Sequence, residues 1–290
     1  MIQFSSRVAG EHFRRLVHRG DPLDVFPTGV ARLSETRFCV PAHWPRAHRF
    51  FAPVRGSHQD PLLIAETMRQ SAMLVCHAEL GVPLGDAFVM WELNYTTAAE
   101  HLVLGEEPWD VVVEVACSDI RRRGSSLRSM RVDFVIRRDG GVLATCGSRI
   151  SCTSAAAYHR LRGSRGPVSV PLIPALAPHT AGRTAERDVV LGPATGPGRW
   201  PLRLDTGHPT LFGRPNDHVP GILLLEAARQ AATATVPGFL PVSVRSDFLR
   251  YVELDRPCRV EAGPAPGGVF VRAEQDGDTV FTCALGGPAV

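Results

Sequence analysis

Residues 217–232, DHVPGILLLEAARQAA, contain the features that decide the fold of this 290-residue chain. Pro220 and Gly221 precede an apolar run with helical spacing, which predicts that a helix begins here. The run nevertheless contains a carboxylate, Glu226, and three residues later a guanidinium, Arg229. A helix that is apolar on nearly all sides is normally buried, and burying ions is costly, so the acid and the base need an explanation.

The same pattern occurs twice in the sequence. A shift of 160 positions aligns seven identical residues: His48 with His208, His58 with His218, Leu63 with Leu223, Glu66 with Glu226, Arg69 with Arg229, Gln70 with Gln230 and Ala72 with Ala232. Composition alone would give about one or two identities in such a window. The long offset indicates a duplicated domain rather than a solenoid repeat. We expect two related domains, residues 1–157 and 185–290, joined by a linker rich in Pro, Gly, Ala and Arg at 158–184.

Each domain is predicted to contain one long helix followed by strands. In the first domain, Asp60 is the expected N-cap, Pro61 the first helical residue and Gly81 the stop. Strand-like runs follow at 88–95, 109–120, 127–138 and 141–152, and in the second domain at 242–253, 258–263, 269–275 and 279–285. Short turns between strands indicate antiparallel pairing. The sequence therefore predicts an α+β fold in which each domain wraps an antiparallel sheet around a long central helix.

Composition and missing motifs exclude several classes of protein. The hydrophobic fraction of 44% and the charged fraction of 21% are those of a soluble globular protein, and no stretch is long and apolar enough for a membrane span or a signal peptide. Seven cysteines without a CxxC pair fit reduced thiols in a cytoplasmic protein. A net charge of +3 does not demand a nucleic-acid partner. Because there is no HExxH, P-loop, GxGxxG or GxSxG motif, we expect no metal and no cofactor.

Three longer stretches carry a family resemblance: LVHRGDPLDVF at 16–26, DPLLIAETMRQSAMLVCHAELGVPLG at 60–85 and HPTLFGRPNDHVPGILLLEAARQA at 208–231. They resemble the A-factor synthase family of γ-butyrolactone autoregulator biosynthesis, whose members are tandem hotdog proteins. The resemblance implies a double hotdog fold and an acyltransferase. The implied reaction moves a β-ketoacyl group from acyl carrier protein, or from CoA, to a hydroxyl of dihydroxyacetone phosphate, in the biosynthesis of a butyrolactone or butenolide signalling molecule or a related secondary metabolite.

The helix motif PGILLLEAARQA also resembles the central helix of hotdog hydroxyacyl-carrier-protein dehydratases. Those enzymes carry a catalytic His well upstream of the helix Glu. At the corresponding distance this sequence has Phe212 and Gly213, and its nearest histidine, His218, lies much closer to the helix. If this protein were a dehydratase, it would therefore lack the histidine that serves as the acid–base group.

The residues expected to carry the chemistry lie on the two helices. Glu66 and Glu226 are expected to occupy a partly desolvated pocket that raises their basicity, so that each could take a proton from the attacking hydroxyl. The residues three and four positions after each glutamate are expected to bind substrate: Arg69, Gln70, Arg229 and Gln230. The two arginines are expected to hold the substrate phosphate. The alternative for each Glu–Arg pair is a buried ion pair that fixes the registry of the helix between the domains.

The loop before the second helix supplies further candidates. Gly221 can present its backbone N–H to a thioester carbonyl at a helix N-terminus, which is the expected oxyanion site. The first helix has Pro61 at this position, without an N–H. We therefore expect the carbonyl chemistry in the second domain. Asp217 and His218 are candidates for orienting substrate or assisting proton transfer, although a loop His before a helix can also be structural.

Two other functions remain open on the sequence. A hotdog thioesterase would use the same Glu to activate water instead of an acceptor hydroxyl. A non-catalytic acyl-binding regulatory protein would bind a thioester without turnover. Fold analogy alone does not choose among these functions.

Overall fold

The computed structural model describes residues 9–163, 165, 168 and 170–289. The elements of the first half are α1 (Ala9–Leu16), the 3₁₀ turn η1 (Pro22–Asp24), β1 (Ala31–Arg32), β2 (Arg37–Trp44), α2 (Leu62–Ala78), β3 (Ala87–Thr96), the 3₁₀ turn η2 (Ala99–Leu102), β4 (Trp109–Arg123), β5 (Ser126–Arg138), β6 (Gly141–Thr153) and α3 (Ala155–Arg162). Those of the second half are the 3₁₀ turn η3 (Glu186–Asp188), β7 (Arg199–Pro201), α4 (Gly221–Thr235), β8 (Ser243–Phe248), β9 (Cys258–Ala265), β10 (Gly268–Gln275) and β11 (Asp278–Gly286).

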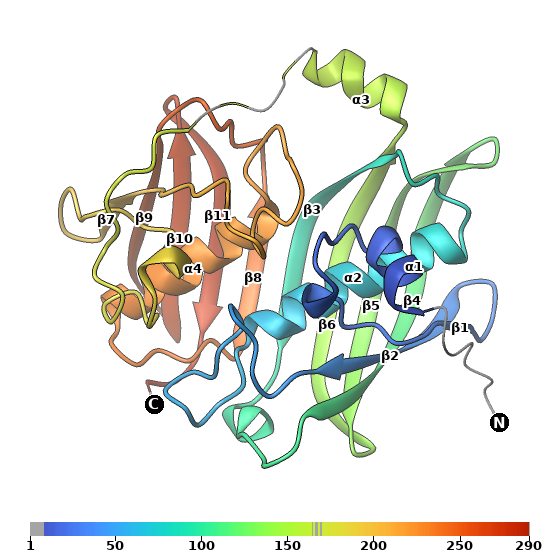
Figure 1. Cartoon of the computed structure of the whole chain (residues 1–290), viewed down its shortest axis with the longest axis horizontal. Coiled ribbons are helices and arrows are strands. Elements are labelled where there is room, and N and C mark those ends of the chain that lie inside the picture. The colour runs from blue at the N-terminus through green and yellow to red at the C-terminus, as the bar shows by residue number, and fades with distance from the viewer. Residues whose placement is uncertain (1–8, 164, 166–167, 169, 290) are drawn as a thin grey trace.

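The strands of both halves form one antiparallel sheet with the order β1-β2-β4-β5-β6-β3-β8-β11-β10-β9-β7. The halves join where Glu92–Thr96 of β3 pairs with Ser243–Asp247 of β8. Figure 1 shows the two halves side by side, with α2 and α4 each beginning near this junction and running outward from it. The sequence predicts a sheet in each domain, and the structure adds that the two sheets share a hydrogen-bonded edge.

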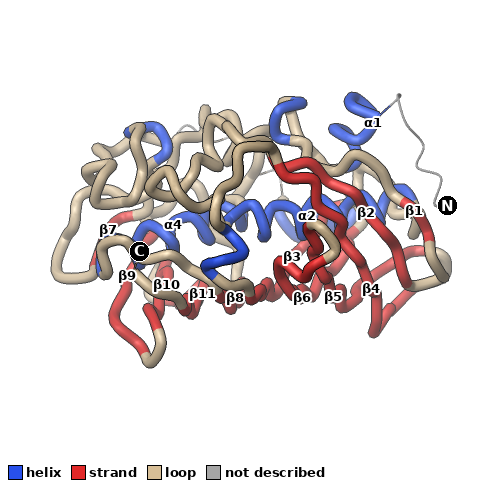
Figure 2. Tube along the Cα trace, turned by 90° about the horizontal axis from the view of Figure 1, so that it is seen from below, coloured by secondary structure: helices blue, strands red, loops and turns tan. Residues whose placement is uncertain are grey.

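The two central helices lie between the sheet and a layer of loops (Figure 2). Nearly every residue of α2 from Leu62 to Cys76, and of α4 from Ile222 to Thr233, is buried. This explains why both helices lack the one-sided polarity of a surface helix, since the sheet covers one side and the loops cover the other. The prediction of an α+β fold with one buried central helix per domain is confirmed.

Some boundaries differ from the sequence prediction. α4 begins at Gly221 as expected, whereas α2 begins at Leu62, with the Asp60 carboxylate accepting a hydrogen bond from the Leu62 N–H at 2.9 Å. The strand expected over 242–253 ends at Phe248. Because β8 ends there, it pairs with only the second part of β3, and no strand in the described part of the chain pairs with the first part of β3 on that side. This gap in the pairing lies beside the cavity described below.

The seven cysteines are all buried and free. Among the described residues, no helix is long and apolar enough to span a membrane.

Candidate functional site

A cavity of about 300 Å³ lies at the junction of the two halves. Its apolar wall comes from α2, from β3, β5 and β6 of the first half, and from α4 and the end of β8: Met68, Ala72, Met73, Phe88, Met90, Phe134, Ile150, Leu224 and Phe248. Polar residues join this wall: His18, Arg19, Arg69, Arg214, Asn216 and His218. An apolar cavity with a few convergent polar groups is the arrangement typical of a small-molecule site.

Cations outnumber carboxylates at the polar part of the cavity. Glu66 is fully buried and accepts hydrogen bonds from Arg19 Nε at 2.9 Å and Arg69 Nη2 at 2.8 Å. Burial and the neighbouring Arg69 lower the pKa of Arg19, and burial, Arg69 and Arg19 lower the pKa of Arg214. Arg19 and Arg69 share the carboxylate of Glu66, and Arg214 contacts His18 instead, so this part of the cavity has a positive charge to offer an anion.

Glu66 is not the basic group that the sequence predicted. Burial alone would raise the pKa of its carboxyl, but the positive charges of Arg19 and Arg69 outweigh burial and lower the pKa to about 2. Gln70 also donates to Glu66, at 2.5 Å, and accepts from the Phe26 N–H at 2.9 Å. Glu66 and Gln70 are fully buried and do not line the cavity, whereas the Arg69 side chain is 24% exposed and does.

The second half repeats this cluster. Glu226 accepts hydrogen bonds from Arg183 Nε at 2.7 Å, Arg229 Nη2 at 2.7 Å and Gln230 Nε2 at 2.6 Å. Burial would raise the pKa of Glu226, but Arg183 and Arg229 lower it to about 2. Gln230 in turn accepts from the Val190 N–H at 2.9 Å. The raised basicity expected for this carboxyl is therefore also absent, because two guanidiniums neutralise the buried charge.

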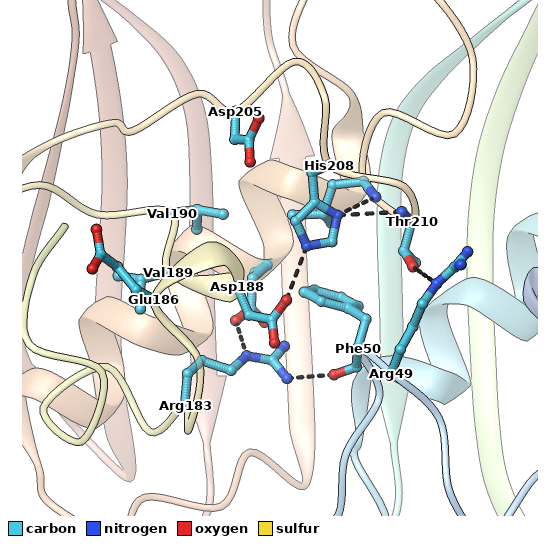
Figure 3. Close-up of polar contacts among 12 residues, drawn as sticks. Arg49, Phe50, Arg183, Glu186, Asp188, Val189, Val190, Asp205, His208 and Thr210 are labelled. Atoms are coloured by element: carbon cyan, nitrogen blue, oxygen red, sulfur yellow. Dashed lines mark hydrogen bonds and ion pairs between the residues drawn. The ribbon is translucent and has the colours of Figure 1, made fainter. Parts of the chain in front are cut away.

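The two clusters are tied to each other across the junction. Arg19 donates to the carbonyl of Thr210 at 2.5 Å, and Arg183 donates to the carbonyl of Phe50 at 2.6 Å (Figure 3). Thr210 and Phe50 stand at equivalent positions, each two residues after a buried histidine. Each cluster therefore joins its own central helix to a loop of the other half, which agrees with the alternative of a buried ion pair that fixes registry.

The paired histidines His48 and His208 are structural. Nδ1 of His208 accepts from the Thr210 N–H at 3.2 Å, and Nε2 contacts Asp188 at 3.1 Å (Figure 3). His48 repeats both contacts, with the Phe50 N–H at 3.1 Å and with Asp24 at 3.1 Å. These contacts shape the loops that the guanidiniums bind.

The two halves differ at the helix N-termini. At α2, the buried carboxylate of Asp60 caps the Leu62 N–H and lies 3.5 Å from Arg183. Two acidic groups, Asp60 and Glu226, thus face Arg183 and Arg229, although burial outweighs the two guanidiniums and raises the pKa of Asp60. Neither Glu226 nor Arg229 lines the cavity, and the Arg229 side chain is only 4% exposed. The pocket that was expected at Glu226 is therefore absent, and the Asp60 side chain lies near Arg183 at this place.

The N-terminus of α4 is open instead. Gly221 lines the cavity, and no side chain in the described part of the chain caps this helix. A helix begun in this way presents unpaired backbone N–H groups and positive potential to whatever occupies the cavity. Gly221 belongs to the second half and Arg69 to the first, so both halves line the cavity.

His218 lines the same cavity beside an acidic partner. Its Nδ1 lies 2.7 Å from Asp217 Oδ1, and Asp217 also accepts from Tyr158 at 2.7 Å and from Arg162 at 2.8 Å. Burial would raise the pKa of the Asp217 carboxyl, but the hydrogen bonds from His218, Arg162 and Tyr158 outweigh it and hold the pKa well below its usual value. Asp217 is therefore a fixed anion behind the ring of His218.

Four groups at these clusters were not predicted from the sequence: His18, Arg19, Arg183 and Arg214. Arg214 donates to His18 Nδ1 at 2.9 Å, and burial, together with Arg214, His77 and Arg69, lowers the pKa of His18 to about 3. Arg19 and His18 lie within the stretch 16–26 that carries the resemblance, which was the available signal. Arg183 lay inside the predicted linker. Among the described residues, no group of three or more His, Cys, Asp and Glu side chains could hold a metal ion.

We predict that Glu226→Gln lowers the free energy of unfolding by about 3–5 kcal/mol, because it leaves two guanidiniums buried without their carboxylate. The folded-state pKa of about 2 lies below the ordinary value of 4.5. The stabilisation by Glu226 is therefore present above about pH 4.5 and is lost as the pH falls toward 2. Urea unfolding at a series of pH values should show a weaker acid dependence in the variant. The exposed Glu107→Gln is the control, and equal stability of the two variants would contradict the prediction.

Comparison with known proteins agrees with this architecture. A family model described as the A-factor biosynthesis hotdog domain matches residues 5–154 and 169–276. The chain is similar to proteins named 2-oxo-3-(phosphooxy)propyl 3-oxoalkanoate synthase. The one from Streptomyces virginiae is 48% identical over 94% of this chain and 96% of its own length, and the one from Streptomyces coelicolor is 47% identical over 94% and 90%.

Solved structures show the same fold at low sequence identity. The 12:0-ACP thioesterase from Umbellularia californica has a TM-score of 0.53 at 15% identity, covering 90% of this chain and all of that one. An acyl-ACP thioesterase from Bacteroides thetaiotaomicron has a TM-score of 0.54 at 10% identity, covering 87% and 99%. At such identities the likeness shows the double hotdog fold alone. The match of the family model over most of both halves, together with relatives nearly half identical over at least 90% of their length, shows that the chain belongs to the A-factor biosynthesis hotdog family.

Proposed function

We propose that the protein is an acyltransferase that moves a 3-oxoacyl (β-ketoacyl) group from a thioester to a hydroxyl of dihydroxyacetone phosphate, in γ-butyrolactone biosynthesis. The observation that carries the proposal is the composition of the cavity. One cavity combines an apolar wall, an uncapped helix N-terminus at Gly221 and a positive group made by Arg69 and Arg214. These three features suit the acyl chain, the thioester carbonyl and the phosphate. The names of the curated relatives describe the same product.

Each feature has a physical part in the reaction. The apolar wall removes the acyl chain from water. Backbone N–H groups at the start of α4 are placed to stabilise the negative charge that develops on the carbonyl oxygen during attack. Arg69 and Arg214 hold the acceptor phosphate, since guanidiniums bind phosphate oxygens with paired hydrogen bonds. The acceptor hydroxyl then meets the carbonyl between the two halves.

Glu66 contributes by holding Arg69 rather than by taking a proton. A carboxyl with a pKa near 2 is a weak base, and Glu66 has no contact with the cavity. Its hydrogen bonds to Arg19 and Arg69 fix the direction of the guanidinium that reaches the cavity. Glu226 and Arg229 keep the equivalent pair in the second half, where it stabilises the junction. We therefore propose one active site per chain.

The thioester donor is proposed to be acyl carrier protein. The side chains of Trp91 and Leu249 line the cavity and are also 47% and 49% exposed, so they lie where the cavity meets the surface. A pantetheine arm entering beside them would bring its thioester toward Gly221. CoA carries the same arm, and comparing the two donors at equal concentration distinguishes them.

Mass spectrometry tests the proposed function directly. A 3-oxoacyl thioester and dihydroxyacetone phosphate should give the phosphorylated ester, with release of one thiol per ester formed. Release of free acid at the same rate with and without the acceptor would identify a thioesterase instead. Binding of the thioester without any turnover would identify an acyl-binding protein.

The two guanidiniums at the cavity are predicted to determine the affinity for the acceptor phosphate. Arg69→Gln and Arg214→Gln should each raise the KM for dihydroxyacetone phosphate about 10- to 100-fold, since a hydrogen bond to a charged group contributes about 1.5–3 kcal/mol. With unphosphorylated dihydroxyacetone, both variants should match the wild type. The exposed Arg187→Gln, outside the cavity, serves as the control. An unchanged KM in both cavity variants would remove the phosphate role.

The backbone N–H of Gly221 is predicted to be essential, which Gly221→Pro tests. Proline suits the first position of a helix, and Pro220 already has the extended ψ of 141° that a following proline requires. Loss of the N–H should reduce kcat about 100- to 1,000-fold. Gly221→Ala keeps the N–H while adding a Cβ 3.1 Å from Phe248, so it reports the effect of bulk. Equal rates in the two variants would argue against the oxyanion role.

A further inference from the structure

We propose that His218 is the general base of this transfer and that Asp217 is its positioning residue. The inference deepens the function proposed above and rests on it. It replaces the assignment of the proton transfer to Glu66 or Glu226, and it names the group that accepts the proton from the acceptor hydroxyl.

His218 lines the cavity, whereas the carboxylates of the two central helices do not. His218 lines the cavity together with Gly221, three residues further along the chain, and its side chain is 25% exposed. Glu66 and Glu226 are fully buried, and three side chains donate hydrogen bonds to each of them. A base must reach the proton that it removes, directly or through one water molecule. His218 meets this condition, and neither glutamate does.

The contacts of the ring fix its tautomer. Nδ1 lies 2.7 Å from the Asp217 carboxylate, which accepts a hydrogen bond and cannot donate one while ionised. The Tyr158 hydroxyl lies farther from Nδ1, at 3.3 Å, and donates its proton to Asp217 at 2.7 Å. The proton of a neutral His218 is therefore held on Nδ1, and Nε2 keeps its lone pair. In residues 9–163, 165, 168 and 170–289, Nε2 has no hydrogen-bond partner, so it is the nitrogen available to substrate. A carboxylate behind a histidine plays the same part in Ser-His-Asp triads.

The position of Asp217 is set by groups from outside its own loop. Tyr158 and Arg162 of α3 donate to its two carboxylate oxygens at 2.7 and 2.8 Å. Arg162 is held in turn by both oxygens of Glu253, at 2.7 and 2.8 Å. The ring of Tyr251 packs edge-on against His218 with 4.7 Å between centroids. The imidazole therefore sits in a prearranged polar frame, as a catalytic base requires.

The proposed step conserves atoms and protons. Nε2 of His218 takes the proton of the acceptor hydroxyl as its oxygen forms a bond to the thioester carbonyl carbon. The tetrahedral intermediate then collapses, the bond between carbon and sulfur breaks, and the leaving thiolate receives the proton from the imidazolium. The products are the phosphorylated ester and a free thiol, and His218 returns to its neutral form.

The test measures ester formation by wild type, His218→Ala, Asp217→Asn and the double variant. The substrates are a 3-oxoacyl N-acetylcysteamine thioester and dihydroxyacetone phosphate. We expect His218→Ala to lower kcat about 100- to 10,000-fold without changing the KM for the acceptor. Added imidazole should restore part of the rate of this variant. Asp217→Asn should lower kcat only while His218 is present, so the double variant should be no slower than His218→Ala.

A matched control lies on the surface of the first half. His43 Nδ1 is 2.8 Å from Asp110, which repeats the His–Asp contact away from the cavity, with the two side chains 46% and 91% exposed. His43→Ala should leave the rate unchanged. Should His218→Ala unfold, as thermal melting would show, His218→Gln keeps the volume and polarity of the site while removing the base.

The outcomes separate this inference from the function on which it rests. If the wild type forms no ester, the proposed function fails and the inference fails with it. If the wild type forms ester and folded His218 variants keep the full rate, only the inference is overturned. A raised KM with unchanged kcat would also overturn it, because His218 would then bind the acceptor without taking its proton.

Discussion

The fold depends on a buried carboxylate held by two guanidiniums, formed once in each half. In each cluster one arginine comes from the central helix and the other from a segment before the strands, and the second arginine also binds a carbonyl of the opposite half. Removing the glutamate of a cluster would leave two guanidiniums without their shared carboxylate, which costs more than the intact cluster contributes over apolar packing. The clusters therefore constrain how the halves meet, and the shared sheet and the cavity follow from that arrangement.

The proposed function depends on a difference between the Glu66 cluster and the Glu226 cluster. Both halves keep the glutamate, arginine and glutamine of the central helix. The Asp60 side chain caps the start of α2, whereas the start of α4 has no side-chain cap in the described residues and lies beside the cavity. Arg69 of the Glu66 cluster lines the cavity together with Arg214, and we propose that they bind a phosphate, whereas Asp60 lies beside Arg183 of the Glu226 cluster. The two halves thus repeat one arrangement of a glutamate bound by two arginines and a glutamine.

The site could be predicted from the sequence only in part. The repeat located Glu66, Arg69, Glu226 and Arg229, and the asymmetry between Pro61 and Gly221 indicated where a thioester carbonyl could bind. The protonation of the glutamates could not be predicted, because it depends on Arg19 and Arg183, which lie 47 and 43 positions away in the chain. Burial by itself favours a raised pKa, and only the positions of these two cations reverse the direction.

By itself, the sequence determined two related domains, one apolar helix in each, antiparallel strands, and the family resemblance. These properties are local or repetitive, so they can be predicted from the spacing of residues and from the apolar pattern of the sequence. Tertiary structure alone decided that β3 and β8 join the sheets, that Gly221 and Arg69 line one cavity, and that Asp60 lies beside Arg183. Those facts depend on contacts between segments distant in the chain, and the energy of a charge or a cavity depends on everything packed around it.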